Sequence, residues 1–306
     1  MDTLIKALVQ AKLDPERIIP RATMARYTTF HIGGPADVLV NIAAANEIPL
    51  ALRAAKAADA PVTVIGNGSN TLVRDGGIRG LVIRIDGSMA SVRREGDCII
   101  AQSGALMRSV ANFAMNEGLT GLEEIAGIPG TIGGGVIMNA GAYGGELAQI
   151  VTRVDAVSLA DGKPVVFEGE SLGFGYRRSA MQIAGVIVTE VTMQLRPGDP
   201  AQIKARMDEL AKARREKQPL EYPSAGSTFK RPEGHFAAKL IDGCGLRGLS
   251  VGDAQVSEKH AGFVINRGSA RASDVLELMH MIRERVFEAY GVTLEPEIRI
   301  IGEDSH

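Results

Sequence analysis

The chain has 306 residues, of which 45% are hydrophobic and 23% charged, and its formal net charge is −2. This length can form two or three domains with a full hydrophobic core, and the composition is that of a soluble globular protein. A nearly neutral charge argues against nucleic acid as the main partner, although local basic clusters can still bind small acidic molecules.

The chain contains two cysteines, Cys98 and Cys244, and neither belongs to a metal-ligand cluster. Two cysteines are too few for a disulfide framework, which suits a reducing cytoplasm. The N-terminal residues mix charged side chains with apolar residues at helical spacing, a pattern that differs from a signal peptide. We therefore expect a cytoplasmic protein that binds no metal and does not span a membrane.

Helices and strands alternate between about residues 46 and 195. An alanine-rich helix over residues 48–59 is followed by a strand over 61–65 and a turn over 66–70. Further elements are expected as strands over 80–86, 98–102, 151–159, 164–167 and 186–195 and as a helix over 105–117. This order is typical of an α+β or α/β fold.

Residues 196–200 read RPGDP, which is typical of a boundary between domains. Three elements are predicted after it: a charged helix over 201–217, a strand over 263–265 and an amphipathic helix over 273–290. Gly291 follows the last helix, where a glycine commonly ends one. We therefore expect an α+β protein with one domain over residues 1–198 and a second over 199–306.

Residues 127–145 read GIPGTIGGGVIMNAGAYGG, in which eight of nineteen residues are glycine and none is charged. So many glycines weaken a helix or strand, but they let a ligand approach the backbone closely. Exposed N–H groups of such a loop, or of a helix N-terminus, can bind an anion. A shorter glycine loop at residues 66–70 follows a strand and can bind a phosphate in the same way. Tight turns alone explain the shorter loop equally well, but they do not explain the longer one.

Three polar residues occur in unusual settings: Arg177 in an arginine pair, Ser227 in a Gly-Ser turn and Glu297 directly after a proline. Their local context alone favours solvated or structural roles. Ser227 has no Gly-x-Ser-x-Gly motif around it, which argues against a hydrolase nucleophile. His31 and His260 lack metal-ligand spacing, so each is expected to be an ordinary loop histidine.

The chain lacks the Rossmann and P-loop nucleotide motifs. It does contain an ordered set of other motifs: TTFHIGG at residues 28–34, GNGSN at 66–70, GIPGTIGG at 127–134, NAGAYG at 139–144, YR at 176–177, AGSTFK at 225–230 and LEPE at 294–297. Each motif is weak, but together they cover nearly the whole chain. In this order they resemble the UDP-N-acetylenolpyruvoylglucosamine reductases of bacterial cell-wall synthesis.

The resemblance implies a two-lobed FAD-binding module of the vanillyl-alcohol-oxidase type over residues 1–198, with the lobes dividing near residues 75–90. A smaller α+β substrate-binding domain is implied over residues 199–306. FAD is implied to bind non-covalently, largely through backbone N–H groups, with NADPH as the hydride donor. The implied FAD contacts are Gly66, Asn67, Gly68, Ser69, Asn70, Gly127, Ile128, Pro129, Gly130, Thr131, Gly133, Gly134, Asn139 and Gly141.

The resemblance further implies reduction of the enolpyruvyl double bond of UDP-N-acetylenolpyruvoylglucosamine to UDP-N-acetylmuramate. Arg177 is carried over as the residue that binds the substrate carboxylate and stabilises the charge that develops there. Glu297 is carried over as its partner in polarising that carboxylate, and Ser227 as the proton donor to the second carbon. Lys217 matches a family position that contacts the UDP diphosphate.

The chain resembles the shorter variant of the family, which lacks an insertion that brings a tyrosine over the nucleotide. Fifty positions separate Arg177 from Ser227, and Tyr222 is the sole tyrosine after Tyr176 in that interval. We expect a monomer. Two alternatives stay open: a flavin oxidase of the same module, with His31 as the candidate for covalent FAD attachment, and a nucleotide-binding regulator without catalytic activity.

Overall fold

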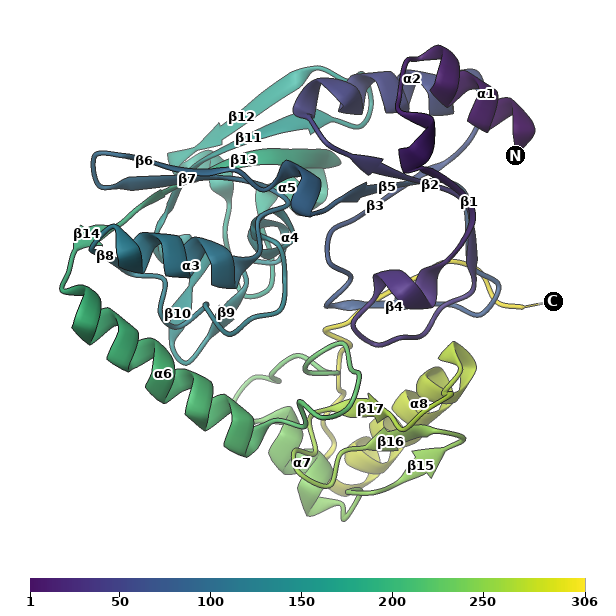
Figure 1. Ribbon diagram of the computed structural model, residues 1–306. Helices are drawn as coiled ribbons and strands as arrows, with labels where there is room; N and C mark the ends of the chain where they lie inside the picture. Colours follow the sequence, from purple (N-terminus) through teal and green to yellow (C-terminus); the bar gives the residue numbers. More distant parts are fainter. Residues whose placement is uncertain (306) are drawn as a thin grey trace. The chain divides into compact units, whose positions relative to one another are not determined.

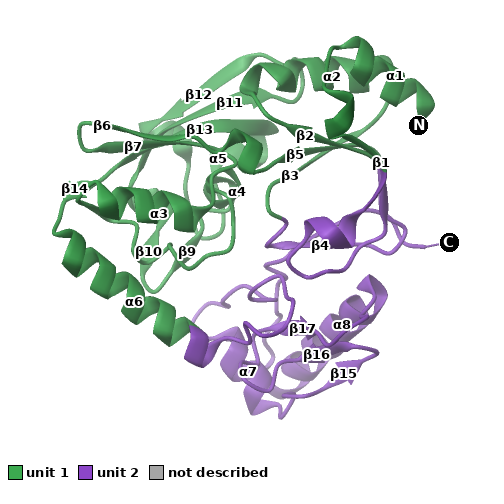
Figure 2. Ribbon diagram, viewed as in Figure 1, with its two compact units in different colours: residues 1–20, 38–67, 80–214 green, residues 21–37, 68–79, 215–306 purple. Residues whose placement is uncertain are grey.

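The computed structural model describes residues 1–305 and divides into two compact units (Figure 2). Unit 1 consists of Met1–Pro20, Val38–Asn67 and Gly80–Arg214, and unit 2 consists of Arg21–Asp37, Gly68–Arg79 and the chain from Arg215 on. Both units are discontinuous in sequence, whereas the predicted domains are two continuous stretches. The assignment of domains stays a prediction.

Unit 1 contains two hydrophobic cores, and the first lies beside a four-stranded sheet in the order β1-β2-β5-β3. The strands are β1 (Ile18–Thr23), β2 (Pro35–Ile42), β3 (Val62–Ile65) and β5 (Ile78–Ile85), of which β3 and β5 run parallel. Helices α1 (Asp2–Gln10) and α2 (Ile48–Ala57) lie side by side (Figure 1). Leu8 from α1 and Leu52 from α2 join Val40 and Ile83 in this core.

The second core of unit 1 is covered by a five-stranded antiparallel sheet in the order β12-β11-β13-β7-β6. The strands are β6 (Val92–Glu95), β7 (Cys98–Gln102), β11 (Val151–Ser158), β12 (Pro164–Glu168) and β13 (Val186–Gln194). Its inner face packs against α3 (Met107–Asn116), α4 (Ile132–Ile137) and α5 (Ala180–Ala184) (Figure 1). Unit 1 also contains β8 (Leu119–Thr120) paired with β14 (Arg196–Pro197), and β9 (Gly141–Ala142) paired with β10 (Gly145–Glu146).

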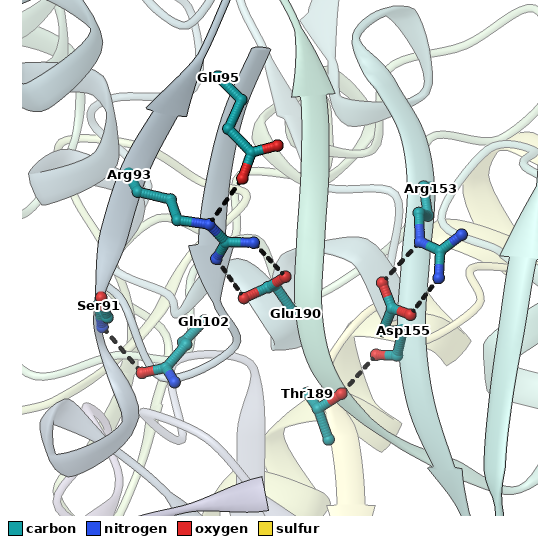
Figure 3. A network of polar contacts seen from close by, with 8 residues as sticks. All are labelled: Ser91, Arg93, Glu95, Gln102, Arg153, Asp155, Thr189 and Glu190. Atoms are coloured by element: carbon teal, nitrogen blue, oxygen red, sulfur yellow. Dashed lines mark hydrogen bonds and ion pairs between the residues drawn. The ribbon is translucent and has the colours of Figure 1, made fainter.

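Side chains alternate across this sheet, so its outer face carries a network of charged residues (Figure 3). Arg93 donates to both carboxylate oxygens of Glu190, at 2.6 and 3.0 Å, and Nε of Arg93 donates to Glu95 at 3.1 Å. Arg153 donates in the same way to both oxygens of Asp155, at 2.6 and 2.9 Å. Each exposed ion pair of this kind adds little stability. Together the charged side chains make the outer face of the sheet polar.

Unit 2 is built around a three-stranded antiparallel sheet of β15 (Ser250–Val251), β16 (Ala254–Val256) and β17 (Val264–Asn266). Helices α7 (Ala237–Gly243) and α8 (Ala272–Tyr290) contribute to its core, and β4 (Thr71–Val73) pairs in parallel with β18 (Arg299–Ile301). The long helix α6 (Pro200–Lys217) begins in unit 1 and ends in unit 2. The remaining turns include 3-10 helices at Pro15–Arg17, Met24–Tyr27, Ala45–Glu47, Gly87–Met89, Leu147–Gln149 and Gly169–Leu172.

The α+β class is confirmed, and the strongly periodic segments form the predicted elements. The helices predicted over 48–59, 105–117, 201–217 and 273–290 are α2, α3, α6 and α8, and the strand predicted over 98–102 is β7. Gly291 ends α8 with a φ of 67°, as predicted. Within the glycine stretch, residues Ile132–Ile137 form the short helix α4, although so many glycines weaken a helix.

Candidate functional site

Arg177 lies at the tip of a tight turn in unit 1. The backbone groups of Gly175 and Arg178 exchange two hydrogen bonds, of 2.9 and 3.1 Å, and leave Tyr176 and Arg177 as the two residues of the tip. Arg177 has a φ of 53°, a left-handed conformation that is uncommon for residues other than glycine. Its Nη2 donates to the carbonyl of Gly141 at 3.3 Å. This turn therefore gives Arg177 an uncommon backbone conformation of the kind that occurs at functional sites, and the Gly141 carbonyl orients its guanidinium.

Asn139 joins the glycine stretch to this turn. Its side-chain Nδ2 donates to the Gly175 carbonyl at 3.0 Å, and its Oδ1 accepts from the N–H of Ala148 at 2.9 Å. Asn139 has a φ of 45° and is 0% exposed, so this burial favours a supporting role over the direct FAD contact that was predicted. Gly141, also a predicted FAD contact, uses its carbonyl to hold Arg177.

The two glycine loops come together in unit 1. Nδ2 of Asn67 donates to the Pro129 carbonyl at 2.6 Å. Gly66 lies so close to Thr131 that a Cβ on Gly66 would be 2.6 Å from the Thr131 Oγ1. A Cβ at position 66 would therefore displace the Thr131 hydroxyl, at the point where the two segments predicted to bind FAD meet.

Close packing explains part of the glycine content of the longer stretch. A Cβ on Gly133 would lie 2.6 Å from the Ser103 Cβ, and one on Gly135 would lie 2.9 Å from the Met107 side chain. The N–H of Gly133 already donates to the Ser103 carbonyl at 2.9 Å, so it is not available to a ligand. Gly134 differs, because it is exposed and nothing but the Thr131 Oγ1, at 3.4 Å, lies near its Cβ position; its N–H donates to the same Thr131 Oγ1 at 3.4 Å. Packing therefore accounts for positions 133 and 135, and ligand access remains the better explanation for Gly134.

Arg214 is a cation that sequence reasoning missed. It projects from α6 onto Gly127, where a Cβ would lie 3.1 Å from the Arg214 Nη1. Burial lowers the pKa of Arg214, and within residues 1–305 no carboxylate forms an ion pair with it. A desolvated guanidinium without a carboxylate is suited to binding an anionic ligand. No sequence pattern distinguishes Arg214, because α6 contains many similar cations. Lys217, the predicted diphosphate contact, is exposed at the end of α6 and belongs to unit 2.

Ser227 and Glu297 lie on paired segments of unit 2. Phe229 and Pro296 form an antiparallel bridge, flanked by hydrogen bonds from Glu297 N to the Thr228 carbonyl at 2.9 Å and from Lys230 N to Glu295 O at 2.8 Å. Pro296 sits at the one position of this pairing that needs no N–H donor. Ser227 is exposed at the start of this pairing, and Glu297 is half-buried at the same end, on the opposite segment, where its N–H bonds to Thr228. The pairing therefore brings the two predicted catalytic residues of unit 2 near each other.

The shorter glycine loop is divided between the units, because Gly66 and Asn67 belong to unit 1 and Gly68, Ser69 and Asn70 to unit 2. The Nδ2 of Asn70 donates to the Glu297 carbonyl at 3.1 Å, and the Asn70 carbonyl accepts from Arg299 N at 2.9 Å. Gly68 has a φ of 63°, and a Cβ there would lie 2.2 Å from the Tyr27 carbonyl. In unit 2 this loop thus fixes the segment that carries Glu297.

Known proteins match this chain over nearly its whole length. A family model described as "UDP-N-acetylenolpyruvoylglucosamine reductase, C-terminal domain" matches residues 218–301, and one described as "FAD binding domain" matches residues 36–168. The UDP-N-acetylenolpyruvoylglucosamine reductase of Clostridium novyi (strain NT) is 47% identical over 98% of this chain and 97% of the relative. This chain belongs to the UDP-N-acetylenolpyruvoylglucosamine reductase family.

A second member of the family, from Pediococcus pentosaceus, is 47% identical over 94% of this chain and 95% of the relative. The crystal structure of the reductase from Thermus caldophilus is 40% identical, with a TM-score of 0.80 over 93% of this chain and 98% of that chain. The predicted family is therefore confirmed, and with it the FAD-binding module. None of the helices in the described part of the chain is long and apolar enough to cross a membrane.

The residues of unit 1 fit FAD as the cofactor of this family. A Cβ at position 66 would displace the Thr131 hydroxyl, and Gly134, whose N–H donates to that hydroxyl, is exposed beside them. Such bare backbone is what a pyrophosphate needs for close approach. The roles of Arg177, Ser227, Glu297 and Lys217 stay predictions.

Proposed function

We propose that this protein uses FAD and NADPH to reduce the enolpyruvyl double bond of UDP-N-acetylenolpyruvoylglucosamine to UDP-N-acetylmuramate, a precursor of peptidoglycan. The observation that carries this proposal is the 47% identity to a reductase of this name over 98% of the chain. A monomeric state and a cytoplasmic location stay predictions from the sequence.

The chemistry that FAD supplies when bound is the transfer of a hydride, taken from NADPH, to the terminal carbon of the enolpyruvyl double bond. Gly66, Asn67, Pro129 and Gly134 are the residues we propose to hold it, because they form the joined glycine loops of unit 1. Asn67 fixes the two loops to each other through Pro129. The backbone between them, without side chains, is proposed to bind the pyrophosphate.

Arg177 is proposed to bind the carboxylate of the substrate. When a hydride adds to the terminal carbon, negative charge spreads from the adjoining carbon onto that carboxylate. A guanidinium presents several N–H donors in a fixed plane and stabilises this charge more in the transition state than in the ground state. The Gly141 carbonyl and the turn of Gly175–Arg178 support the proposal, because they fix the orientation of the Arg177 side chain before substrate binds.

Ser227 is proposed to donate its hydroxyl proton to the adjoining carbon, which completes the addition of one hydride and one proton across the double bond. The serine oxygen then regains a proton from solvent. A serine hydroxyl is a weak acid, but the carbon that it protonates is strongly basic, so the transfer depends on proximity. Glu297 is proposed to help polarise the carboxylate and to share a proton with it.

Two cations are proposed to contact the diphosphate of the sugar nucleotide, Lys217 and Arg214. Lys217 is proposed from the family resemblance, and its exposed ammonium on a flexible stem suits a point contact with phosphate. Arg214 is supported by its own surroundings, because its half-buried guanidinium lies against Gly127 and pairs with no carboxylate of the described residues, which leaves it able to bind an anion.

The experiment that tests the proposal is anaerobic mixing of purified enzyme with NADPH, followed by addition of the enolpyruvyl sugar nucleotide. We expect the flavin colour to bleach with NADPH and to return with the sugar nucleotide. Failure of the colour to return would refute the proposal, and rapid recolouring by oxygen alone would favour the flavin oxidase. Release of the yellow colour into the supernatant of acid-denatured protein is expected, whereas colour retained in the pellet would indicate covalent FAD.

A further inference from the structure

Ser227 lies in a short bulge, residues 225–227, between two contacts of its segment, one with β17 and one with Gly262 just before that strand. Ser224 bridges Ile265 in an antiparallel pairing, and further along Thr228 N donates to the Gly262 carbonyl at 2.9 Å. Positions 224 and 228 differ by four and positions 262 and 265 by three, so the Ser227 segment contains one extra residue. A β-bulge of this kind turns side chains out of the ladder and is common beside active sites.

The side chain of Thr228 accepts a hydrogen bond for which the bulge leaves no backbone acceptor. Its Oγ1 accepts from the backbone N–H of Val264 at 2.9 Å, and both residues are buried, with 3% and 2% of their surface exposed. Without the Thr228 hydroxyl, a buried N–H in β17 would have no acceptor, and native proteins rarely tolerate this. The hydroxyl therefore stabilises the bulge that exposes Ser227.

Thr228 is also fixed on its opposite side. Its carbonyl accepts from the N–H of Glu297 at 2.9 Å, beside the bridge of Phe229 to Pro296. Three hydrogen bonds of equal length thus tie one buried residue to β17 and to the Glu297 segment. Only one of the three uses the side chain, so one substitution can remove it and leave the two backbone bonds.

We propose that Thr228 is a positioning residue: its Oγ1 holds the bulge on which Ser227 presents its hydroxyl to the substrate carbon. This inference rests on the proposed function, in which Ser227 donates a proton. Thr228 itself touches no substrate in this account, because it is buried. Loss of the Thr228 hydroxyl should therefore slow reduction of the sugar nucleotide, the step that uses Ser227, and leave the rate of flavin reduction by NADPH unchanged.

The test compares Thr228→Val, which keeps the shape but removes the acceptor, with Thr228→Ser, which keeps the hydroxyl. We expect Thr228→Val to be reduced by NADPH at the wild-type rate and to be reoxidised by the enolpyruvyl sugar nucleotide about 100-fold more slowly, the loss typical of a reacting group displaced by 1 Å. Thr228→Ser should restore most of that rate. Thr293→Val, at an exposed threonine of the same unit, is the matched control and should change neither step.

Wild-type reoxidation by the sugar nucleotide separates the two proposals. If wild type is not reoxidised, the proposed function fails; if wild type is reoxidised and Thr228→Val matches it, the role of Thr228 fails. Equal slowing of both steps in Thr228→Val would also overturn the inference, because the residue would then be merely structural. Should Thr228→Val not retain FAD, hydrogen exchange of the Val264 amide in wild type decides: fast exchange overturns the inference, and slow exchange together with full activity of Thr228→Ser supports it.

Discussion

Asn139→Gly should lower the free energy of unfolding and loosen the turn that positions Arg177. Glycine accepts the left-handed backbone of Asn139, whose φ is 45°, so the substitution removes the side chain without imposing backbone strain. Two hydrogen bonds are lost, to the Gly175 carbonyl and from the Ala148 N–H. Leaving partly buried groups unpaired costs about 1–3 kcal/mol each, and the added flexibility of the unfolded chain costs about 0.5–1 kcal/mol. Since both partners are half-buried and water can reach them, we expect a total near 2–4 kcal/mol.

Urea unfolding of the holoenzyme measures this loss, with Asn116→Gly as a control at an exposed asparagine. The same variant should slow flavin reoxidation by the sugar nucleotide about 100-fold, because the Arg177 turn loses its anchor. Combining Asn139→Gly with Arg177→Lys should slow the reaction by less than the product of the single effects, because both act on one contact. Wild-type stability of Asn139→Gly, or strictly multiplicative rates, would show that Asn139 does not anchor the Arg177 turn.

Four further substitutions test the glycine loops, the two cations proposed to bind the diphosphate, and the partly buried His260. Gly66→Ala places a methyl group about 2.6 Å from the Thr131 Oγ1 and should weaken FAD binding, measured by flavin fluorescence. An unchanged affinity for FAD would contradict the proposal that the two glycine loops of unit 1 bind it together. Arg214→Met should raise the KM for the sugar nucleotide about tenfold without lowering stability, because a half-buried cation without a carboxylate partner is lost. Lys217→Met should raise the KM less, and the reverse order would favour Lys217 as the main contact. Burial lowers the pKa of His260 below its usual value of 6.5. As the pH falls below 6.5, the unfolded chain therefore takes up a proton that the folded chain does not, and the free energy of unfolding should decrease. His260→Gln should flatten this dependence between about pH 7 and 5 in urea titrations, and an unchanged slope would rule His260 out as its source.

The sequence predicted the regular elements well where the apolar pattern was long. Helix α8 buries Val275, Leu278, Ile282 and Val286 at helical spacing, and this pattern alone located it within one residue at its start. The glycine stretch was harder to interpret, because glycine is a poor helix former and α4 is stabilised by contacts with Ser103 and Met107 that come from elsewhere in the chain. Helix propensity therefore cannot predict α4, because its glycines are required by the close packing of Ser103 and Met107.

The candidate site was predicted in part. The ordered motifs indicated the family, which the comparisons confirmed, and they named Arg177, Ser227 and Glu297. They did not reveal that Asn139 anchors the Arg177 turn or that Asn70 anchors Glu297, because both contacts join residues far apart in sequence. Local patterns indicate which residues are unusual, whereas supporting hydrogen bonds depend on the folded chain.

The most direct test of the account is the single-turnover behaviour of Ser227→Ala, measured anaerobically in two steps. We expect NADPH to bleach the flavin of Ser227→Ala at the wild-type rate. The enolpyruvyl sugar nucleotide should then restore the flavin colour at least about 100-fold more slowly than in wild type, because the proton donor is missing. Equal rates of recolouring in Ser227→Ala and wild type would contradict the central claim that Ser227 donates the proton.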